Sequence, residues 1–566
     1  MIMKNITAYV LLLFVAVGCS LEEDRESFAD RANSYQTVFQ AEAVVKSCYA
    51  DIHQLFNSSS AMMMEVASDL WVQSSSIVDS YSNISPSRSG QGDRIWKYCY
   101  NGIMRANEAI ECILASDIDE EAKMYLQAEA RVLRAFFYYY LTNTFNGVPY
   151  YKCMVKDMAT IEMIRRLPRT DASIIRADLY ADLKDNAIPY FTENNGLKKR
   201  TSEVKGNRAG YALGLMLMAK FAMWNEEWTL ALEPLEELEE LYGVLSEENY
   251  PLDETVWWKK NTAESIFEVQ HEWQADGIQF YSSVCTNMYP KVLSDGTLDG
   301  LLMPEWGRQL STHTSASATY HFAAFRPKTG GSREESTSAT YAKSIFRPLP
   351  LTFGEYNESL DRLEAVIDLN AVETGRKGAE KIDRRVFYVL GFGNLETGET
   401  FNSVRKYGNP YGGMKFWIPD RTANYDSNNY KIFRYADAVL MMAECWCMKG
   451  EYDKALNLVA LVRDRAGVDT DRSLSDEESV MQLIRDERAR ELGGELHRRY
   501  DLVRWGIWYD AIIQYQTKTS KIYNTVKPYH RYYPIPDSQC ALSGYILDNP
   551  EYADAEGTEG ETDVEN

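Results

Sequence analysis

The sequence has no apolar run long enough to cross a membrane. The strongest candidate, residues 5–17, contains about 13 residues, whereas a membrane-spanning helix needs about 20. This run follows Lys4 and ends at Gly18-Cys19, where a small residue precedes a processing point. Residues 1–18 are therefore predicted to be a secretory signal peptide, and no segment is expected to span the membrane.

The sequence also lacks the residue spacings of metal and redox sites. It has no C-x-x-C pair, its six histidines are dispersed, and no cysteine lies at zinc-ligand spacing from a histidine. We expect no metal and no cofactor. Cys445 and Cys447 fall in an apolar helical segment, where free cysteine packs as a small hydrophobe.

Basic charge and catalytic motifs are missing as well. The net charge of −23 argues against nucleic acid as a partner, because binding to phosphates needs a basic surface. There is no nucleophile elbow or phosphate-binding loop, and Gly391-Phe392-Gly393 lacks the third glycine of a dinucleotide turn. Carboxylates are so abundant that pairs of them identify nothing. The sequence therefore gives no catalytic residue and predicts that the chain is not an enzyme.

The end of the signal peptide predicts a lipid anchor. Ala16-Val17-Gly18-Cys19 resembles the bacterial lipobox, with Ala16 in place of the usual leucine, and Cys19 would become the lipidated N-terminus. The alternative is an unlipidated signal in which Cys19 is incidental. The acidic run after Cys19 resembles a signal for export to the cell surface or is a simple solvated tether, and residues 19–36 are assigned to this tether.

Apolar residues recur with helical spacing in three parts of the chain, residues 37–141, 208–242 and 434–506. The second and third contain helix pairs, with turns at Asn225-Glu226-Glu227 and Lys449-Gly450-Glu451 and small residues where the helices cross. This pattern is typical of tetratricopeptide units, although neither pair matches the full consensus. We predict a mainly α fold, a tetratricopeptide-like helical repeat scaffold with a loop-rich ligand-binding side.

The composition changes between residues 250 and 429. This segment has short apolar runs, aromatic residues and turn signals such as Ser294-Asp295-Gly296, which indicate a loop-rich insertion into the domain spanning residues 37–550. Binding residues concentrate on loops carried by a rigid scaffold, so the ligand surface is expected here and in residues 58–94. The acidic residues 551–566 are predicted to be a disordered tail.

Several motifs occur together in an order that resembles the SusD/RagB family of outer-membrane nutrient-binding lipoproteins. Asn143–Pro149 resembles the family's NTFGGVP turn, with Asn146 replacing a glycine. The complete set is Trp96–Ile103 with Ala106-Asn107, Ala128–Tyr138, Asn143–Pro149, Asp383–Arg385, Arg434–Leu440 with Ala443-Glu444, Val462–Gly467, Ile484–Leu492, Arg499–Gly506, Tyr533–Pro536 and Asn549-Pro550.

This resemblance covers nearly the whole mature chain. It implies four tetratricopeptide-like units, a loop-rich ligand side, anchoring in the outer membrane facing outward, and a TonB-dependent, SusC-like transporter as partner. It implies a glycan or oligosaccharide ligand by family frequency, while a peptide ligand fits the same scaffold. The family's ligand residues lie in variable loops, so no binding residue is carried over.

The charged residues of these motifs are predicted to be structural. Arg131 and Arg134 lie beside Glu129, and Arg485, Glu487, Arg488, Arg490 and Glu491 lie on a later helix, at spacings that allow pairing along one helix face. Arginine forks also tie helices to one another. Asn107 and Asp437, on apolar helix faces, are expected to be buried hydrogen-bond anchors.

The ligand surface is predicted from exposed aromatic residues, on which the apolar face of a sugar ring stacks, with polar groups nearby for its hydroxyls. The candidates are Asp69, Trp71, Trp273, Tyr281, Trp306 and Tyr320. The competing interpretation for each aromatic residue is core packing. Two other functions stay open at this point: a scaffold that binds only a protein partner, and a glycan hydrolase with two carboxyls in a cleft.

Overall fold

The computed structural model describes residues 35–56, 68–69, 71–73, 85–88, 91–255, 257, 259–271, 291–292, 298–299, 302–304, 351–357, 362–367, 415, 428–515 and 525–552. The expected signal peptide, Cys19, all but the last two residues of the tether, the Asp383–Arg385 motif and the tail after Tyr552 lie outside these residues. The same holds for most of the insertion at 250–429. Within the described part of the chain, no helix combines the length and the apolar character needed to cross a membrane.

Helices dominate the described residues, as predicted. They are α2 (Val38–Phe56), α5 (Gln91–Ala115), α6 (Glu120–Phe145), α7 (Met158–Arg165), α8 (Ala172–Asn186), α9 (Tyr211–Trp224), α10 (Trp228–Tyr242), α18 (Tyr435–Met448), α19 (Tyr452–Arg465), α20 (Glu477–Glu491), α21 (Arg498–Arg504), α22 (Trp508–Tyr515) and α24 (Asp537–Leu542). The strands are β1 (Trp71–Gln73), β2 (Ser265–Val269), β3 (Lys291–Val292), β4 (Leu298–Asp299), β5 (Leu302–Pro304), β6 (Leu351–Asn357), β7 (Arg362–Ile367) and β8 (Tyr430–Arg434).

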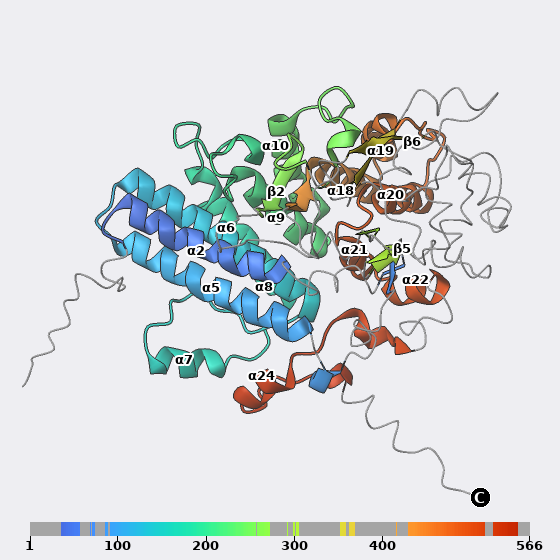
Figure 1. Ribbon diagram of the computed structural model, residues 1–566. Coiled ribbons are helices and arrows are strands. Elements are labelled where there is room, and N and C mark those ends of the chain that lie inside the picture. The colour runs from blue at the N-terminus through green and yellow to red at the C-terminus, as the bar shows by residue number, and fades with distance from the viewer. Residues whose placement is uncertain are drawn as a thin grey trace, which may run out of the picture.

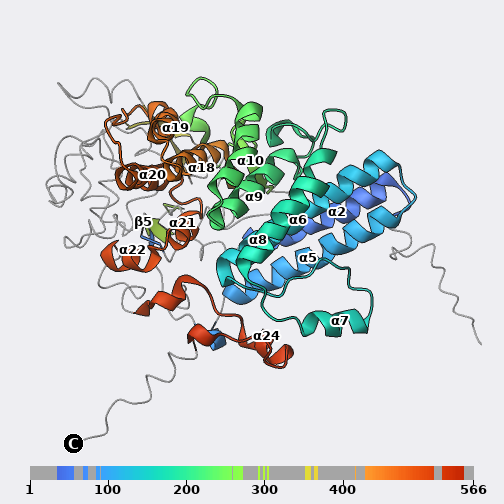
Figure 2. The same ribbon diagram turned by 180° about the vertical axis from the view of Figure 1, so that it is seen from behind.

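Helix α6 is the central helix of the scaffold. Every residue from Val132 to Phe145 is buried, which is the pattern of a helix enclosed on all its faces. It lies beside α2 and α5 on one side and α8 and α9 on the other (Figures 1 and 2). Gly102 of α5 permits close contact with α6, because a Cβ there would overlap the ring of Phe137.

The two predicted helix pairs form with the turns expected from the sequence. Helices α9 and α10 are joined through Glu226, and α18 and α19 through Gly450. Both turn residues have a left-handed backbone, with φ of 59° and 77°, and the next amide in each donates to a carbonyl near the end of the first helix. Asn146, which replaces the glycine of the family turn, also has a positive φ of 62°.

A short antiparallel pair of strands closes the base of the insertion. Strand β2 pairs with β8, so that Val269 lies opposite Tyr430, and both strands are buried along their whole length. The described strands inside the insertion form local pairs, β3 with β4 and β6 with β7, while β5 pairs with β1. The insertion therefore leaves and rejoins the scaffold at one place, beside α18.

The charged motif residues are structural, but they join elements more often than they pair along one helix. Glu129 pairs with Arg208, and both Arg131 and Arg134 pair with Asp182 of α8 at 2.5 Å. On α20, the pair of Arg490 with Glu487 lies within the helix at 2.8 Å, whereas the partners of Arg488 and Glu491 lie on other elements. The expected pairing along one helix face is thus wrong for most of these residues, because buried charges need partners that the neighbouring elements supply.

The two predicted polar anchors are confirmed. Asn107 is fully buried and accepts a hydrogen bond of 2.8 Å from Arg134. Asp437 is fully buried between Lys220 at 2.7 Å and Arg488 at 2.9 Å. Although burial alone would raise the pKa of Asp437, these two cations hold it well below its usual range.

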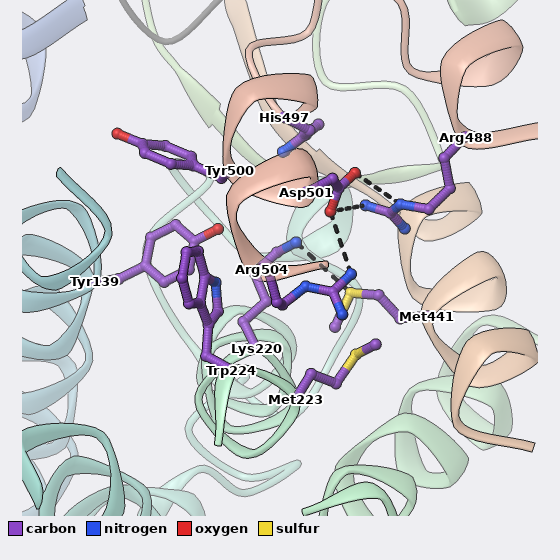
Figure 3. Close-up of a pocket in the computed structure, with 10 residues that line it drawn as sticks. All are labelled: Tyr139, Lys220, Met223, Trp224, Met441, Arg488, His497, Tyr500, Asp501 and Arg504. Carbon is purple, nitrogen blue, oxygen red and sulfur yellow. Dashed lines mark hydrogen bonds and ion pairs between the residues drawn. The ribbon is translucent and has the colours of Figure 1, made fainter. Parts of the chain in front are cut away.

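Asp437 belongs to a cluster of charges between α9, α18, α20 and α21. Figure 3 shows its neighbours Lys220 and Arg488 together with Asp501 and Arg504. Asp501 accepts from Arg488 at 2.8 Å and from Arg504 at 3.3 Å, and Arg504 also pairs with Glu444. The cavity between these side chains has a volume of about 10 Å³, which is room for one water molecule. Its lining comprises Tyr139, Lys220, Met223, Trp224, Met441, Arg488, His497, Tyr500, Asp501 and Arg504. The cluster therefore fastens helices together and has no room for a nutrient molecule.

Glu226 generates a prediction, because it holds the left-handed position that glycine holds in the second helix pair. Replacing Glu226 by glycine should raise the free energy of unfolding by up to about 1 kcal/mol. A left-handed backbone is about 1–2 kcal/mol less favourable for a residue with a side chain than for glycine. Part of this gain is offset because glycine increases the entropy of the unfolded chain. Gly450→Ala should lower it by about 1 kcal/mol, because no atom lies near the new Cβ and only the backbone conformation is penalised.

Thermal unfolding followed by calorimetry measures both changes. Glu226→Ala is the matched control, because it removes the same exposed side chain and keeps the strained backbone. A stabilisation by alanine equal to that by glycine would contradict this explanation.

His497 predicts a loss of stability in mild acid. Burial, together with the nearby Lys220, lowers its pKa to about 4. The carboxylates of Asp437, Glu495 and Asp501 raise this pKa but do not compensate for burial. The unfolded chain, with an ordinary histidine pKa near 6.5, binds this proton first, so the free energy of unfolding should fall by about 2 kcal/mol per such histidine between pH 7 and pH 5. Urea unfolding at the two pH values tests this. In His497→Gln the fall should be smaller, and an equal fall in both proteins would show that His497 titrates normally.

Candidate functional site

Of the predicted ligand residues, the structure describes Asp69 and the backbone of Trp71, which lie next to α21. Asp69 is described in full and Trp71 by its backbone, whereas Trp273, Tyr281, Trp306 and Tyr320 lie outside the described residues. Strand β1 begins at Trp71 and pairs with β5 in antiparallel register, Trp71 opposite Pro304 and Gln73 opposite Leu302. Strand β5 ends two residues before Trp306, so this pairing brings the surroundings of two predicted aromatic residues together across a long sequence separation.

Asp69 lies at the scaffold end of this strand pair. It is 2% exposed, and its two carboxylate oxygens accept from Nε and Nη2 of Arg498, at 2.8 and 2.7 Å. Arg498 is the first residue of α21 and donates from its third nitrogen to the carbonyl of Arg485 at 3.0 Å. The views of Figures 1 and 2 agree with this contact, because β5 lies beside α21 and α22 in both.

A second segment of the insertion reaches the same part of the scaffold through Lys415. Its ammonium group is 2.5 Å from Glu495 and donates to the carbonyls of Glu491 and Gly493 at 3.1 and 3.0 Å. Burial alone would raise the pKa of Glu495, but Arg434 and Lys415 lower it below its usual value. The start of α21 thus holds Asp69, two residues before β1, and the connection between α20 and α21 holds Lys415 of the insertion.

The base of the insertion is also fixed by buried polar contacts. The amide of His271 donates to the side chain of Asn429 at 2.9 Å, and Asn429 donates to Glu268 at 2.9 Å. The ring of His271 lies 4.9 Å from that of His53 at the end of α2. Burial, with His53 and Lys260 nearby, lowers the pKa of His271 to about 3, so this ring is neutral at physiological pH.

A larger cavity, of about 350 Å³, lies where the C-terminal segment crosses the end of α6 and the start of α8. Arg169 closes one side of it by donating to the carbonyls of Phe145, Gly147 and Asp548, at 2.8, 2.8 and 3.1 Å. The exposed carboxyl groups of Asp171, Asp548 and Glu551 line it as well, which disfavours an acidic ligand. None of the predicted ligand residues lies among its lining residues.

Neither Arg498 nor Lys415 was identified as part of the site from the sequence. Arg498 is separated from Asp69 by 429 positions, and Lys415 lies in a segment without periodic pattern, so no local spacing could reveal either contact. Among the described residues, no group of three or more histidine, cysteine or acidic side chains could hold a metal ion. The arrangement is one of loops fastened to a rigid frame, which suits binding.

Comparisons with known proteins agree with this architecture. Residues 399–552 match the model of the SusD family, and residues 21–178 match a family model described as starch-binding associating with outer membrane. SusD-like protein P25 of Formosa agariphila is 24% identical over 96% of this chain and 98% of its own length.

Solved structures have the same fold over nearly the whole chain. A laminarin binding SusD-like protein is 20% identical with a TM-score of 0.59, and the match covers 92% of this chain and 100% of that one. Surface glycan-binding protein A from Bacteroides thetaiotaomicron, in complex with laminarihexaose, is 19% identical with a TM-score of 0.59 over 90% of this chain and 99% of that one. The matches at both ends and the common helical scaffold lead to one conclusion: the chain is similar to SusD-family proteins over nearly its whole length.

Proposed function

We propose that this protein captures a glycan or its oligosaccharide fragments at the cell surface and delivers them to a TonB-dependent, SusC-like transporter in the outer membrane. The SusD-like relatives include proteins that are named as glycan-binding or laminarin binding, which supports a binding role and not a catalytic one. The observation that carries the proposal is the match over nine tenths of the chain to proteins named for laminarin and laminarihexaose binding.

The geometry supports binding on the insertion side. The insertion returns to the scaffold through β2 and β8, and the strand that starts at Trp71 is held against α21. Rigid support of this kind lowers the entropy lost when loops close on a ligand. The cavity of Figure 3 is too small for a sugar. The proposal keeps the ligand surface on the residues predicted from the sequence, Trp71, Trp273, Tyr281, Trp306 and Tyr320.

The N-terminal match supports a place at the outer membrane, because its family is described as associating with it. The acidic segment behind Cys19 fits transport to the outer face, where a large glycan is accessible. A lipid chain on Cys19 would hold the protein next to its transporter, which raises the effective concentration of captured ligand at the entrance.

Binding of the full chain, purified in detergent, is tested by affinity electrophoresis and calorimetry against laminarin, laminarihexaose, starch, other polysaccharides and a peptide mixture. We expect saturable binding to a glycan without release of cleaved sugar. Alanine at Trp71, Trp273 or Trp306 should raise Kd about tenfold when that residue stacks on a sugar. Trp446→Ala on α18 is the matched control and should leave Kd unchanged. Binding to peptides alone, or release of sugar fragments, would contradict glycan capture.

Replacing Cys19 by alanine tests the anchor. Without the thiol no lipid can be attached, and the protein should move from the outer-membrane fraction into the soluble fraction of the cell, because a single protein domain without an apolar anchor has no other firm hold on the bilayer. Fractionation followed by immunoblotting measures the distribution, with Cys153→Ala as the matched control. Full retention of Cys19→Ala in the membrane would show that the anchor lies elsewhere.

A further inference from the structure

Asp69 was predicted to contact the ligand, but its carboxylate is already engaged. Both oxygens accept charge-assisted hydrogen bonds from Arg498, and only 2% of the residue is exposed. A sugar hydroxyl would have to displace the guanidinium and leave a buried arginine without its counter-charge. Both carboxylate oxygens of Asp69 are therefore occupied by Arg498.

Arg498 provides a rigid partner for this contact. It donates to the carbonyl of Arg485 on α20, and its guanidinium lies 5.7 Å from the ring of Trp505. The connection between α20 and α21 is held by Glu495, whose carboxylate forms ion pairs with Arg434 at 2.7 Å and with Lys415 at 2.5 Å. The position of Asp69 is thus set by a part of the scaffold that is itself fixed from several elements.

Asp69 is joined to the strand pair through the backbone. Strand β1 begins two residues after Asp69, at Trp71, and it pairs along its length with β5. Three residues of β1 pair in register with three of β5, too few to hold their own place on the scaffold. The ion pair of Asp69 supplies the attachment.

We propose that Asp69 is a positioning residue, whose buried bidentate ion pair with Arg498 holds the β1–β5 strand pair against α21 in the geometry needed for glycan capture. This inference rests on the proposed function for its effect on affinity, but the fastening itself can be measured without any ligand.

The test compares Asp69→Asn with the unchanged full chain. Asparagine keeps the size of the side chain but loses its charge and one of the two acceptors. Hydrogen–deuterium exchange followed by mass spectrometry should show faster exchange in the peptide that contains residues 69–73. The Kd for laminarin should rise about tenfold or more, the loss of one well-placed contact.

The matched control is Glu129→Gln. Glu129 is also fully buried and also pairs with an arginine, Arg208, but it lies on α6 within the helical scaffold. This variant should lower Tm while leaving both the exchange of residues 69–73 and the Kd unchanged. A purely structural role for Asp69 would give the same pattern as Glu129→Gln.

A second variant guards against a general loss of folding. Asp69→Leu combined with Arg498→Met removes both charges, so no buried charge is left alone, and such replacements are often tolerated. It should fold and should still bind laminarin as weakly as Asp69→Asn. Unchanged exchange in Asp69→Asn, or faster exchange with unchanged Kd, would overturn the proposal. If the unchanged chain binds no glycan at all, the proposed function fails, and the exchange measurement alone decides on the fastening.

Discussion

The rest of the structure depends on one buried arginine, Arg434. Its guanidinium contacts Glu264 at 2.6 Å, Glu495 at 2.7 Å and Glu491 at 3.1 Å, and it is 1% exposed. Arg465 and Lys415 complete a group of three cations and three carboxylates. Such a group adds little net stability compared with apolar packing. Removal of one partner, however, leaves a buried charge without a counter-charge and lowers the free energy of unfolding strongly. The surrounding elements therefore have to take the one arrangement in which all these charges are paired. The group joins the base of the insertion, helices α19 and α20, and the connection to α21.

Glu264 shows how this constraint works locally. It precedes β2, yet its carboxylate accepts from the amide of Ala436 at 3.2 Å and its carbonyl from that of Tyr435 at 2.9 Å, at the start of α18. A carboxylate at a helix N-terminus satisfies free amides and interacts favourably with the helix dipole. Glu264 thus fixes the start of β2 and also contacts the start of α18, where its partner Arg434 lies 170 positions later in the sequence.

The helical half of the molecule could be predicted because its signals are local. The spacing of apolar residues in α5 and α6 and the turns at Glu226 and Gly450 depend on neighbours three or four positions away. The ion pairs could not be predicted in the same way. Nothing in the sequence around Arg134 and Arg488 indicates that their partners are Asp182 and Asp501. The sequence likewise predicts Asp69 to be a polar residue of the ligand loop, because its partner Arg498 is far away in the chain. The aromatic candidates of the insertion follow from composition alone and stay predictions.

The closed base of the insertion has an evolutionary consequence. Val269 and Tyr430 lie opposite each other in the β2–β8 pair. The two ends of the insertion are therefore side by side where they join the scaffold, and their separation does not depend on the length of the insertion. The entropy of closing a flexible loop grows only with the logarithm of its length, by about 0.6 kcal/mol per doubling. Insertions and deletions between these strands that leave Lys415 in place therefore cost the frame little. Mutation can change the rest of the insertion while the helices that carry it keep their sequence motifs.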